Sequence, residues 1–138
     1  MKRQGGIAIG PDQRHAAIGG DEIEARFDLG IETRVADFTK GLDLHALDGI
    51  VMANCLHFVR NKAPVLESVR DMLRPGGRLI VVEYSTDRGN PWVPYPFTYA
   101  TWVRMAEAAG LQGTEQLHSV PSRYFGSMYS ALSRRPAT

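Results

Sequence analysis

The stretch LRPGGRLIVVEY, residues 73–84, decides how this 138-residue chain folds. Its proline and glycines end the helical pattern that precedes it, because proline cannot extend a helix and glycine accepts the left-handed backbone of a helix cap. The run from Arg78 to Tyr84 is rich in β-formers and predicts a buried strand. Glu83 and Tyr84 close that run. A buried charge is costly without a partner, so Glu83 is a candidate for a functional site.

Helical and extended patterns alternate on both sides of this stretch. Between Asn61 and Leu73, apolar residues recur at helical spacing, and charged residues occupy the opposite face. Helices are also predicted over 99–109 and, whole or broken, over 12–28. Strands are predicted over residues 7–9, 31–37, 47–54, 78–84, 114–120 and 124–135. This alternation is typical of an α/β fold with a mostly parallel sheet, helices on both faces and a C-terminal antiparallel hairpin.

The composition excludes several classes of partner. Sixteen basic residues against fifteen acidic ones leave a formal charge of +1, which gives no field that favours nucleic acid or an anionic membrane. No apolar run approaches the roughly 20 residues of a membrane helix, and MKRQGG leads into no signal-peptide segment. The single cysteine, Cys55, lies in an apolar run. We therefore expect a cytoplasmic protein whose thiol belongs to the core rather than acting as a nucleophile.

The carboxyl ends of the predicted strands are the places to look for a site, because ligands of open parallel sheets bind beyond those ends. The residues there are Asp37, Asn54 and Glu83, and we expect their side chains to meet in one cleft. The loop after the last of them carries Trp92 and Tyr95 among three prolines. Two interpretations of these aromatic residues stay open. They cover a bound acceptor, or they seal the next helix against the sheet.

Five segments carry a resemblance when their order and spacing are taken together: ADF (36–38), LDGIVMANCLHF (47–58), LRPGGRLIVVEY (73–84), AAGL (108–111) and MYSAL (128–132). In that arrangement the chain resembles the class I S-adenosylmethionine-dependent methyltransferases from about Ile31 to its C terminus. The resemblance implies a Rossmann-like sheet and methyl transfer from S-adenosylmethionine to a small-molecule acceptor. The identity of that acceptor does not follow from it.

The resemblance also implies where the cofactor binds. Asp37 and Phe38 match the acid and hydrophobe that hold adenine at the end of the family's third strand. The Asn54 backbone and Leu56 match the segment that lies against the methionine half. The structural alternative for Asp37 and Phe38 is a turn cap beside a core aromatic residue. No metal is expected.

The remaining site residues are predicted around the acceptor. They form a catalytic group, His57, Glu83 and Tyr84, and an acceptor-binding group, Trp92, Tyr95 and Arg123. His57 would look into the cleft as a proton acceptor, or it is a satisfied structural histidine. Arg123 is a partner for Glu83, an anchor for an anionic substrate or a solvated surface group.

The N-terminal part departs from the family. The family's first strand and its glycine-rich turn are missing before Ile7, and GIAIGPD resembles the second strand with Gly10 where an acid is expected. We therefore interpret 1–138 as one partial domain with a poorly matched segment at 1–30, from a truncated or wrongly started reading frame. A missing central strand exposes two sheet edges, which a rearranged N-terminal third, a second copy or another chain would cover. We also expect Met1–Gly30 to be less well ordered than the rest.

Two other functions compete with this interpretation. A non-catalytic remnant, acting as a binding or dimerisation module, would keep the fold and lose the cofactor. A nicotinamide oxidoreductase shares the sheet architecture but needs its own glycine fingerprint and a catalytic acid. The chain has no Tyr-x-x-x-Lys sequence, which disfavours that class.

Overall fold

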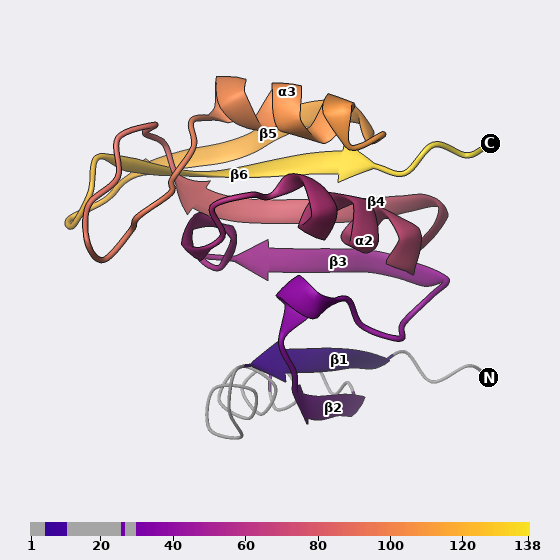
Figure 1. Cartoon of the computed structure of the whole chain (residues 1–138). Coiled ribbons are helices and arrows are strands. Elements are labelled where there is room, and N and C mark those ends of the chain that lie inside the picture. The colour runs from indigo at the N-terminus through magenta and orange to yellow at the C-terminus, as the bar shows by residue number, and fades with distance from the viewer. Residues whose placement is uncertain (1–4, 11–25, 27–29) are drawn as a thin grey trace. The chain divides into compact units, whose positions relative to one another are not determined.

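The computed structural model describes residues 5–10, 26 and 30–138, and the chain divides into two compact units, residues 1–42 and 43–138 (Figure 1). In the first unit, β1 (Gly5–Gly10) pairs in parallel with β2 (Gly30–Val35), and a short 3-10 helix, η1 (Phe38–Lys40), follows. Both strands predicted for this region are therefore present. The helical pieces expected over 12–28 lie outside the described residues except at 26, as does most of the segment for which we expected lower order.

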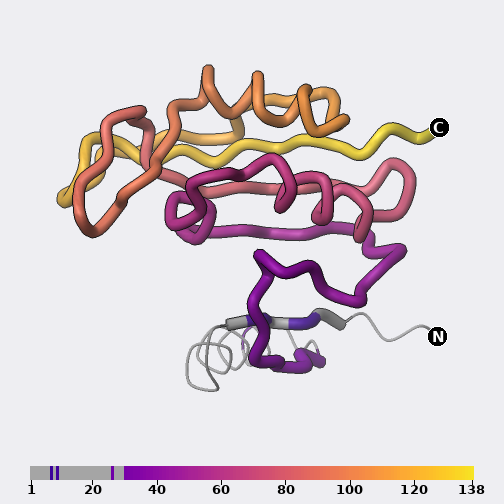
Figure 2. The backbone as a smooth tube through the Cα atoms, viewed as in Figure 1, coloured from indigo at the N-terminus to yellow at the C-terminus, as the bar shows by residue number. Residues whose placement is uncertain are grey.

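The second unit is built on one four-stranded sheet in the order β3-β4-β6-β5. Its strands are β3 (Leu47–Ala53), β4 (Leu73–Tyr84), β5 (Gln112–Pro121) and β6 (Ser127–Arg134). β3 and β4 are parallel, and β6 runs antiparallel to both β4 and β5. Three strands thus share one direction, and Figure 2 traces β3, β4 and β6 as neighbouring extended segments. The α/β class and the C-terminal antiparallel hairpin are confirmed.

β4 is the strand on which the second unit is organised, because it pairs with β3 on one edge and β6 on the other. Leu79, Val81 and Glu83 alternate along it and have no exposed surface, so one face of the strand is fully covered. The preceding helix ends before the RPGG turn, earlier than predicted. The backbone before a proline disfavours helix, and the strand begins at Leu73 at once. Gly76, with φ 77°, instead supplies a left-handed residue inside the irregular start of β4.

Two helices, α2 (Ala63–Met72) and α3 (Tyr99–Ala108), pack side by side over one face of this sheet (Figure 1). The Arg70 guanidinium of α2 donates to the Ala109 carbonyl at the end of α3, over 2.8 Å. The chain steps from β3 to β4 to β5 across the sheet in one direction, and right-handed crossovers then place both helices on the same face. Helical cover on both faces was predicted, and the described part of the second unit has it on one. No helix in the described ranges has the length and apolar character needed to cross a membrane.

Candidate functional site

A buried carboxylate lies where β3 and β4 end side by side. Glu83, near the end of β4, has no exposed surface. Its Oε1 accepts hydrogen bonds from the backbone amides of Leu56, at 3.1 Å, and His57, at 3.3 Å. Its Oε2 lies 2.7 Å from His57 Nδ1. The donors come from a second 3-10 helix, η2 (Leu56–Phe58), which follows β3 directly.

Burial dominates the electrostatics of this carboxylate. Removal from water raises the pKa of Glu83, while hydrogen bonds from the His57 ring and from the two amides act in the opposite direction. The His57 ring is also buried, with 3% of the residue exposed. An acid left alone in such a place would cost several kcal/mol, so the three donors account for how it is tolerated. We call these two residues the Glu83–His57 pair.

Aromatic rings surround the histidine of the pair. The His57 ring centroid lies 4.3 Å from that of Phe58 and 5.9 Å from that of Tyr84. Tyr84 is half-buried and meets Phe125 edge-on, with centroids 5.8 Å apart. The imidazole is therefore held in a largely apolar setting by flat side chains. The three residues predicted as catalytic, His57, Glu83 and Tyr84, are thus brought together.

The residues between β3 and the pair form a tight connection. Asn54 has a φ of 54°, a left-handed conformation uncommon outside glycine, and its amide donates to the Val82 carbonyl over 2.9 Å. Asn54 is exposed where β3 has ended. The Leu56 side chain, which the resemblance places near the cofactor, is fully buried, and its place beside the cofactor stays a prediction. The left-handed backbone of Asn54 is a kind of strain that is often found at functional sites.

Cys55 precedes the pair directly and is partly buried. Burial raises the pKa of its thiol to about 11, and the nearby Glu83 charge acts in the same direction. Because the thiolate is the nucleophilic form, this thiol is poorly reactive at neutral pH. The environment agrees with the prediction of a core cysteine rather than a nucleophile.

The segment between β4 and α3, residues 85–98, is here called the aromatic loop. The Asn90 side chain accepts from the amides of Trp92, at 2.9 Å, and Val93, at 2.8 Å, and so shapes the turn on which the tryptophan stands. Trp92 is 78% exposed and Tyr95 is 40% exposed. Val93 and Phe97 are buried and seal the loop against the core in their place. Of the two interpretations above, the exposure of Trp92 and Tyr95 favours a surface that meets a ligand.

Both ends of the aromatic loop are fastened. Near its start, the Asp87 carboxylate accepts from the Thr98 amide, at 3.1 Å, and from the Thr101 hydroxyl, at 2.9 Å, at the beginning of α3. Near its end, the Tyr95 amide donates to the His57 carbonyl over 2.9 Å. The loop therefore attaches directly to the residue that forms half of the Glu83–His57 pair.

Lys62 completes this attachment, and sequence reasoning did not find it. Its ammonium donates to the carbonyls of Val59, at 2.8 Å, and Tyr95, at 2.9 Å, and only 8% of the residue is exposed. Burial lowers the pKa of Lys62, while the charge of Glu83 acts to raise it. One signal in the sequence could have drawn attention to it. Lys62 is the N-cap of α2, where the helix dipole disfavours a cation and where side-chain acceptors are preferred.

Asp37 and Phe38 belong to the first unit, at the point where β2 has ended. The Asp37 carboxylate accepts from the Thr39 amide, at 3.0 Å, and the Thr39 hydroxyl, at 2.6 Å. These hydrogen bonds lower the pKa of Asp37. The turn-cap alternative is therefore realised, while the exposed carboxylate keeps acceptor capacity for a ligand. The meeting of Asp37 with Asn54 and Glu83 in one cleft stays a prediction, because the two units are described separately.

Arg123 lies in the connection between β5 and β6 and is exposed. It is not the partner of Glu83, because that carboxylate is satisfied by η2. Of the three alternatives given for Arg123, the ion pair with Glu83 is therefore excluded, and an anion anchor or a solvated surface group stays open. The reason lies in the topology of the sheet. The end of β4 lies beside the end of β3, so the residues that follow β3 are the ones that contact the Glu83 carboxylate.

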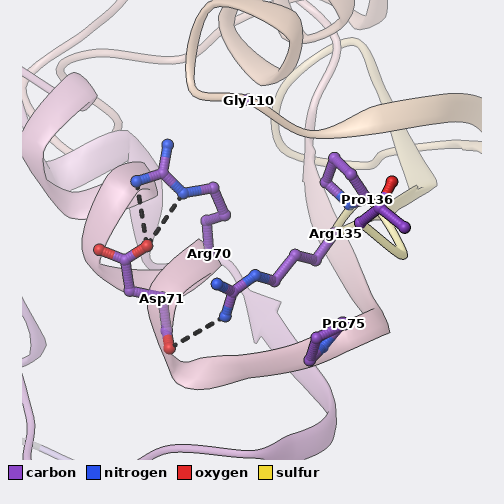
Figure 3. A pocket seen from close by; sticks show the side chains of 7 residues that line it. Arg70, Asp71, Pro75, Gly110, Arg135 and Pro136 are labelled. Carbon is purple, nitrogen blue, oxygen red and sulfur yellow. Dashed lines mark hydrogen bonds and ion pairs between the residues drawn. The ribbon is translucent and has the colours of Figure 1, made fainter.

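In the described part of the chain, two surface cavities of about 300 Å³ each have none of the predicted site residues in their lining, although Lys62 lines one of them. One is between α2 and α3. The other, shown in Figure 3, is lined by Arg70, Asp71, Pro75, Gly110, Arg135, Pro136 and Thr138. In it the Arg70 guanidinium is paired with Asp71 at 3.0 Å, and Arg135 donates to the carbonyls of Asp71 and Leu73. Pro75 lies near the start of β4 and Glu83 near its end, so this cavity is remote from the Glu83–His57 pair.

Comparison with known proteins identifies the class. A family profile described as a methyltransferase domain matches residues 1–81, more than half of the chain, and the chain therefore belongs to that family. A solved SAM-dependent methyltransferase from Methanosarcina mazei superposes with a TM-score of 0.71 at 13% identity, covering 100% of this chain and 95% of that chain. The solved CurJ carbon methyltransferase gives a TM-score of 0.69 at 17% identity, covering 99% of this chain and 50% of that chain. The predicted membership of a methyltransferase family is confirmed, and these solved structures share the predicted Rossmann-like fold.

The curated proteins that are similar in sequence include polyketide synthases. The reducing polyketide synthase grgA of a Penicillium species is 28% identical over 113 residues, which are 68% of this chain and 4% of that protein. The chain thus spans a few per cent of the length of the curated relatives that it matches. The alignment therefore covers only one segment of a relative that is much longer than this chain.

Proposed function

We propose that this chain transfers a methyl group from S-adenosylmethionine to a carbon atom of a small acyl acceptor of the polyketide type. Membership of the methyltransferase family, and likeness to polyketide synthases and to a carbon methyltransferase, support this choice. The observation that carries it is the buried contact of 2.7 Å between Glu83 Oε2 and His57 Nδ1.

The reaction class follows from what such a pair does. A carbon acceptor must lose a proton before it becomes a nucleophile, so the site needs a base. When the Glu83 carboxylate accepts from the Nδ1–H of His57, the Nε2 lone pair is left to take that proton. The C–H electron pair stays on the acceptor, delocalised onto an adjacent carbonyl, and forms the new C–C bond. Glu83 then faces the imidazolium and stabilises its charge, as a triad acid does.

The cofactor supplies an electrophilic methyl group on a positively charged sulfur, which departs with the electron pair of the broken bond. Asp37 and Asn54 fit the task of holding it, since each is exposed beside a strand end and keeps hydrogen-bonding capacity. Phe38, half-buried next to Asp37, offers a surface on which the adenine ring would pack. These residues would bind and orient the cofactor, and His57 would accept the proton from the acceptor.

The acceptor surface of this proposal is the aromatic loop. Trp92 and Tyr95 present flat, rigid side chains at the surface. Tyr95 is joined to the backbone of His57, and Tyr84 flanks the imidazole. Excluding water protects the carbanion from protonation by solvent. Arg123 is assigned to an anionic part of the acceptor. The assignment follows from the exposed position and the positive charge of Arg123.

Two measurements on the full chain test the proposal. Calorimetry with S-adenosylhomocysteine tests the cofactor, and absence of binding at millimolar ligand would leave a non-catalytic binding module. Acetoacetyl-N-acetylcysteamine, a small β-keto thioester, tests the acceptor class against a catechol and a primary amine under the same conditions. Mass spectrometry should find a methyl group on the carbon between the two carbonyls. Methylation of the catechol or amine alone would overturn the carbon assignment.

A further inference from the structure

Lys62 makes a set of contacts that folding alone does not require. Its ammonium bridges the carbonyls of Val59 and Tyr95 and lies 5.1 Å from the centroid of the Phe97 ring. Burying a cation opposes its charged form, and the lowered pKa of Lys62 reflects that cost. The position is also the N-cap of α2, where a cation is unfavourable. A residue held at such cost is a candidate for function.

These contacts hold one residue of the aromatic loop, Tyr95, by both of its backbone groups. The Tyr95 amide donates to the His57 carbonyl, and the Tyr95 carbonyl accepts from Lys62. Since His57 and Lys62 are five residues apart in sequence, the segment that carries the base also carries both anchors of the loop. A shift of Lys62 is therefore a shift of the acceptor surface relative to His57 Nε2.

The remainder of the loop depends on this anchor. Asp87 fixes the other end to α3, and between the two the Asn90 turn presents Trp92 to solvent. Apart from the Tyr95 amide, the described hydrogen bonds between residues 88–97 and the segment 57–62 come from Lys62 alone. Release of the ammonium would leave Tyr95 held to the segment 57–62 by one backbone hydrogen bond. Phe97, two residues further on, would stay fixed by its packing and by the Tyr129 hydroxyl, which donates to its carbonyl over 2.9 Å.

We infer that Lys62 is a positioning residue that sets the aromatic loop, and with it the acceptor, at the Glu83–His57 pair. The inference rests on the proposed function for its catalytic part, and the placement of the loop stands on geometry. Lys62 touches neither cofactor nor acceptor in this account. It acts through the backbone of Tyr95.

The test compares Lys62→Met, which keeps the length of the stem and removes the donor, with Lys62→Arg, which keeps the charge. Arg60→Met is the matched control, since Arg60 is an exposed cation two residues away. In Lys62→Met, amide exchange at Tyr95 should accelerate at least tenfold while exchange in 79–82 is unchanged. The kcat/KM for acetoacetyl-N-acetylcysteamine should fall about 10- to 100-fold, as expected for a misplaced reactant. Affinity for S-adenosylhomocysteine should stay within twofold.

Rescue separates positioning from bulk stability. Lys62→Arg should recover most of the Tyr95 protection and of the kcat/KM, and Arg60→Met should match the wild type in both. Unchanged exchange at Tyr95 in Lys62→Met would overturn the inference, and so would an equal acceleration at Tyr95 and across 79–82. If the wild type itself shows no methyl transfer, the proposed function fails, and the exchange data still decide whether Lys62 holds the loop.

Discussion

Replacing Glu83 by glutamine should separate the chemical role of this residue from its structural one. The glutamine carbonyl oxygen can accept from the same two amides that now meet Oε1, those of Leu56 and His57. Its NH2 group can donate to His57 Nδ1, so every hydrogen bond of the pair is kept. The substitution removes the negative charge and reverses one hydrogen bond, because the side chain at position 83 now donates to His57 Nδ1 instead of accepting from it.

The stability of Glu83→Gln should therefore stay within about 1.5 kcal/mol of the wild type at neutral pH. Glu83→Ala should instead cost about 3–5 kcal/mol, because it leaves two buried amides and an imidazole without a partner. Burial raises the folded-state pKa of Glu83 above the ordinary 4.5. Its contribution to stability is thus fully present below pH 4.5 and is lost as the pH rises through the folded value. Relative to Glu83→Gln, the wild type should weaken over that window.

The activity of Glu83→Gln should be nearly abolished. The new amide donates to Nδ1, which places the imidazole proton on Nε2, where the base is needed. Loss of a general base lowers kcat by about 10²–10⁴-fold. The assay is methyl transfer to acetoacetyl-N-acetylcysteamine followed by mass spectrometry. Deuterium uptake at the acceptor carbon in D2O, measured without methyl donor, reports the proton step by itself.

Two outcomes would refute this reasoning. Activity of Glu83→Gln within threefold of the wild type would show that His57 needs no carboxylate and is not the base. A Glu83→Gln variant as unstable as Glu83→Ala would show that the charge itself holds η2. Urea titrations of the three proteins at pH 4.5 and pH 8 supply the comparison, with affinity for S-adenosylhomocysteine as the control for an intact cofactor site.

Three further predictions follow from other residues. Asp37→Ala should weaken S-adenosylhomocysteine binding at least tenfold by calorimetry while the unfolding free energy falls by about 1 kcal/mol at most, since the carboxylate is exposed and caps only the short turn at Thr39; unchanged affinity would remove the adenine assignment. Trp92→Ala should raise the acceptor KM about tenfold with a change in unfolding free energy below about 0.5 kcal/mol, because the ring is 78% exposed; an equal loss of Tm and activity would mean that it only packs. Cys55, with a pKa of about 11, should be alkylated roughly tenfold faster for each pH unit between 8 and 10, and a plateau below pH 9 would contradict its burial.

Much of the fold could be read from periodicity. The run from Arg78 to Tyr84 indicated a strand and is the end of β4, and the apolar spacing before it indicated α2 to within two residues. The helical cover of a single face could have been derived as well. Steps from β3 to β4 to β5 in one direction, with right-handed crossovers, place both helices together. What periodicity could not give is the insertion of β6 between β4 and β5, because strand order is a long-range property.

For the candidate site, the sequence predicted the positions of residues at strand ends, but it did not predict which side chains contact one another. Strand ends pointed to Asn54 and Glu83, but the link between Glu83 and His57 depends on how η2 turns back after β3. Lys62 was missed because a lysine before a helix is usually solvated, and its burial depends on a loop that arrives 33 residues later in the chain. Exposure also could not be assigned in advance. Trp92 and Val93 are neighbours, and the Asn90 turn decides which of them faces water.

The place of β6 has a consequence for biosynthesis. This strand is the last in the sequence, yet it pairs on both edges, with β4 and with β5. Until β6 has been synthesised and has entered the sheet, β5 has no neighbour in it and one edge of β4 is open to pairing with other chains. The last of these strands therefore completes the sheet from its middle, and removal of residues 127–134 should destabilise the second unit far more than their small number suggests.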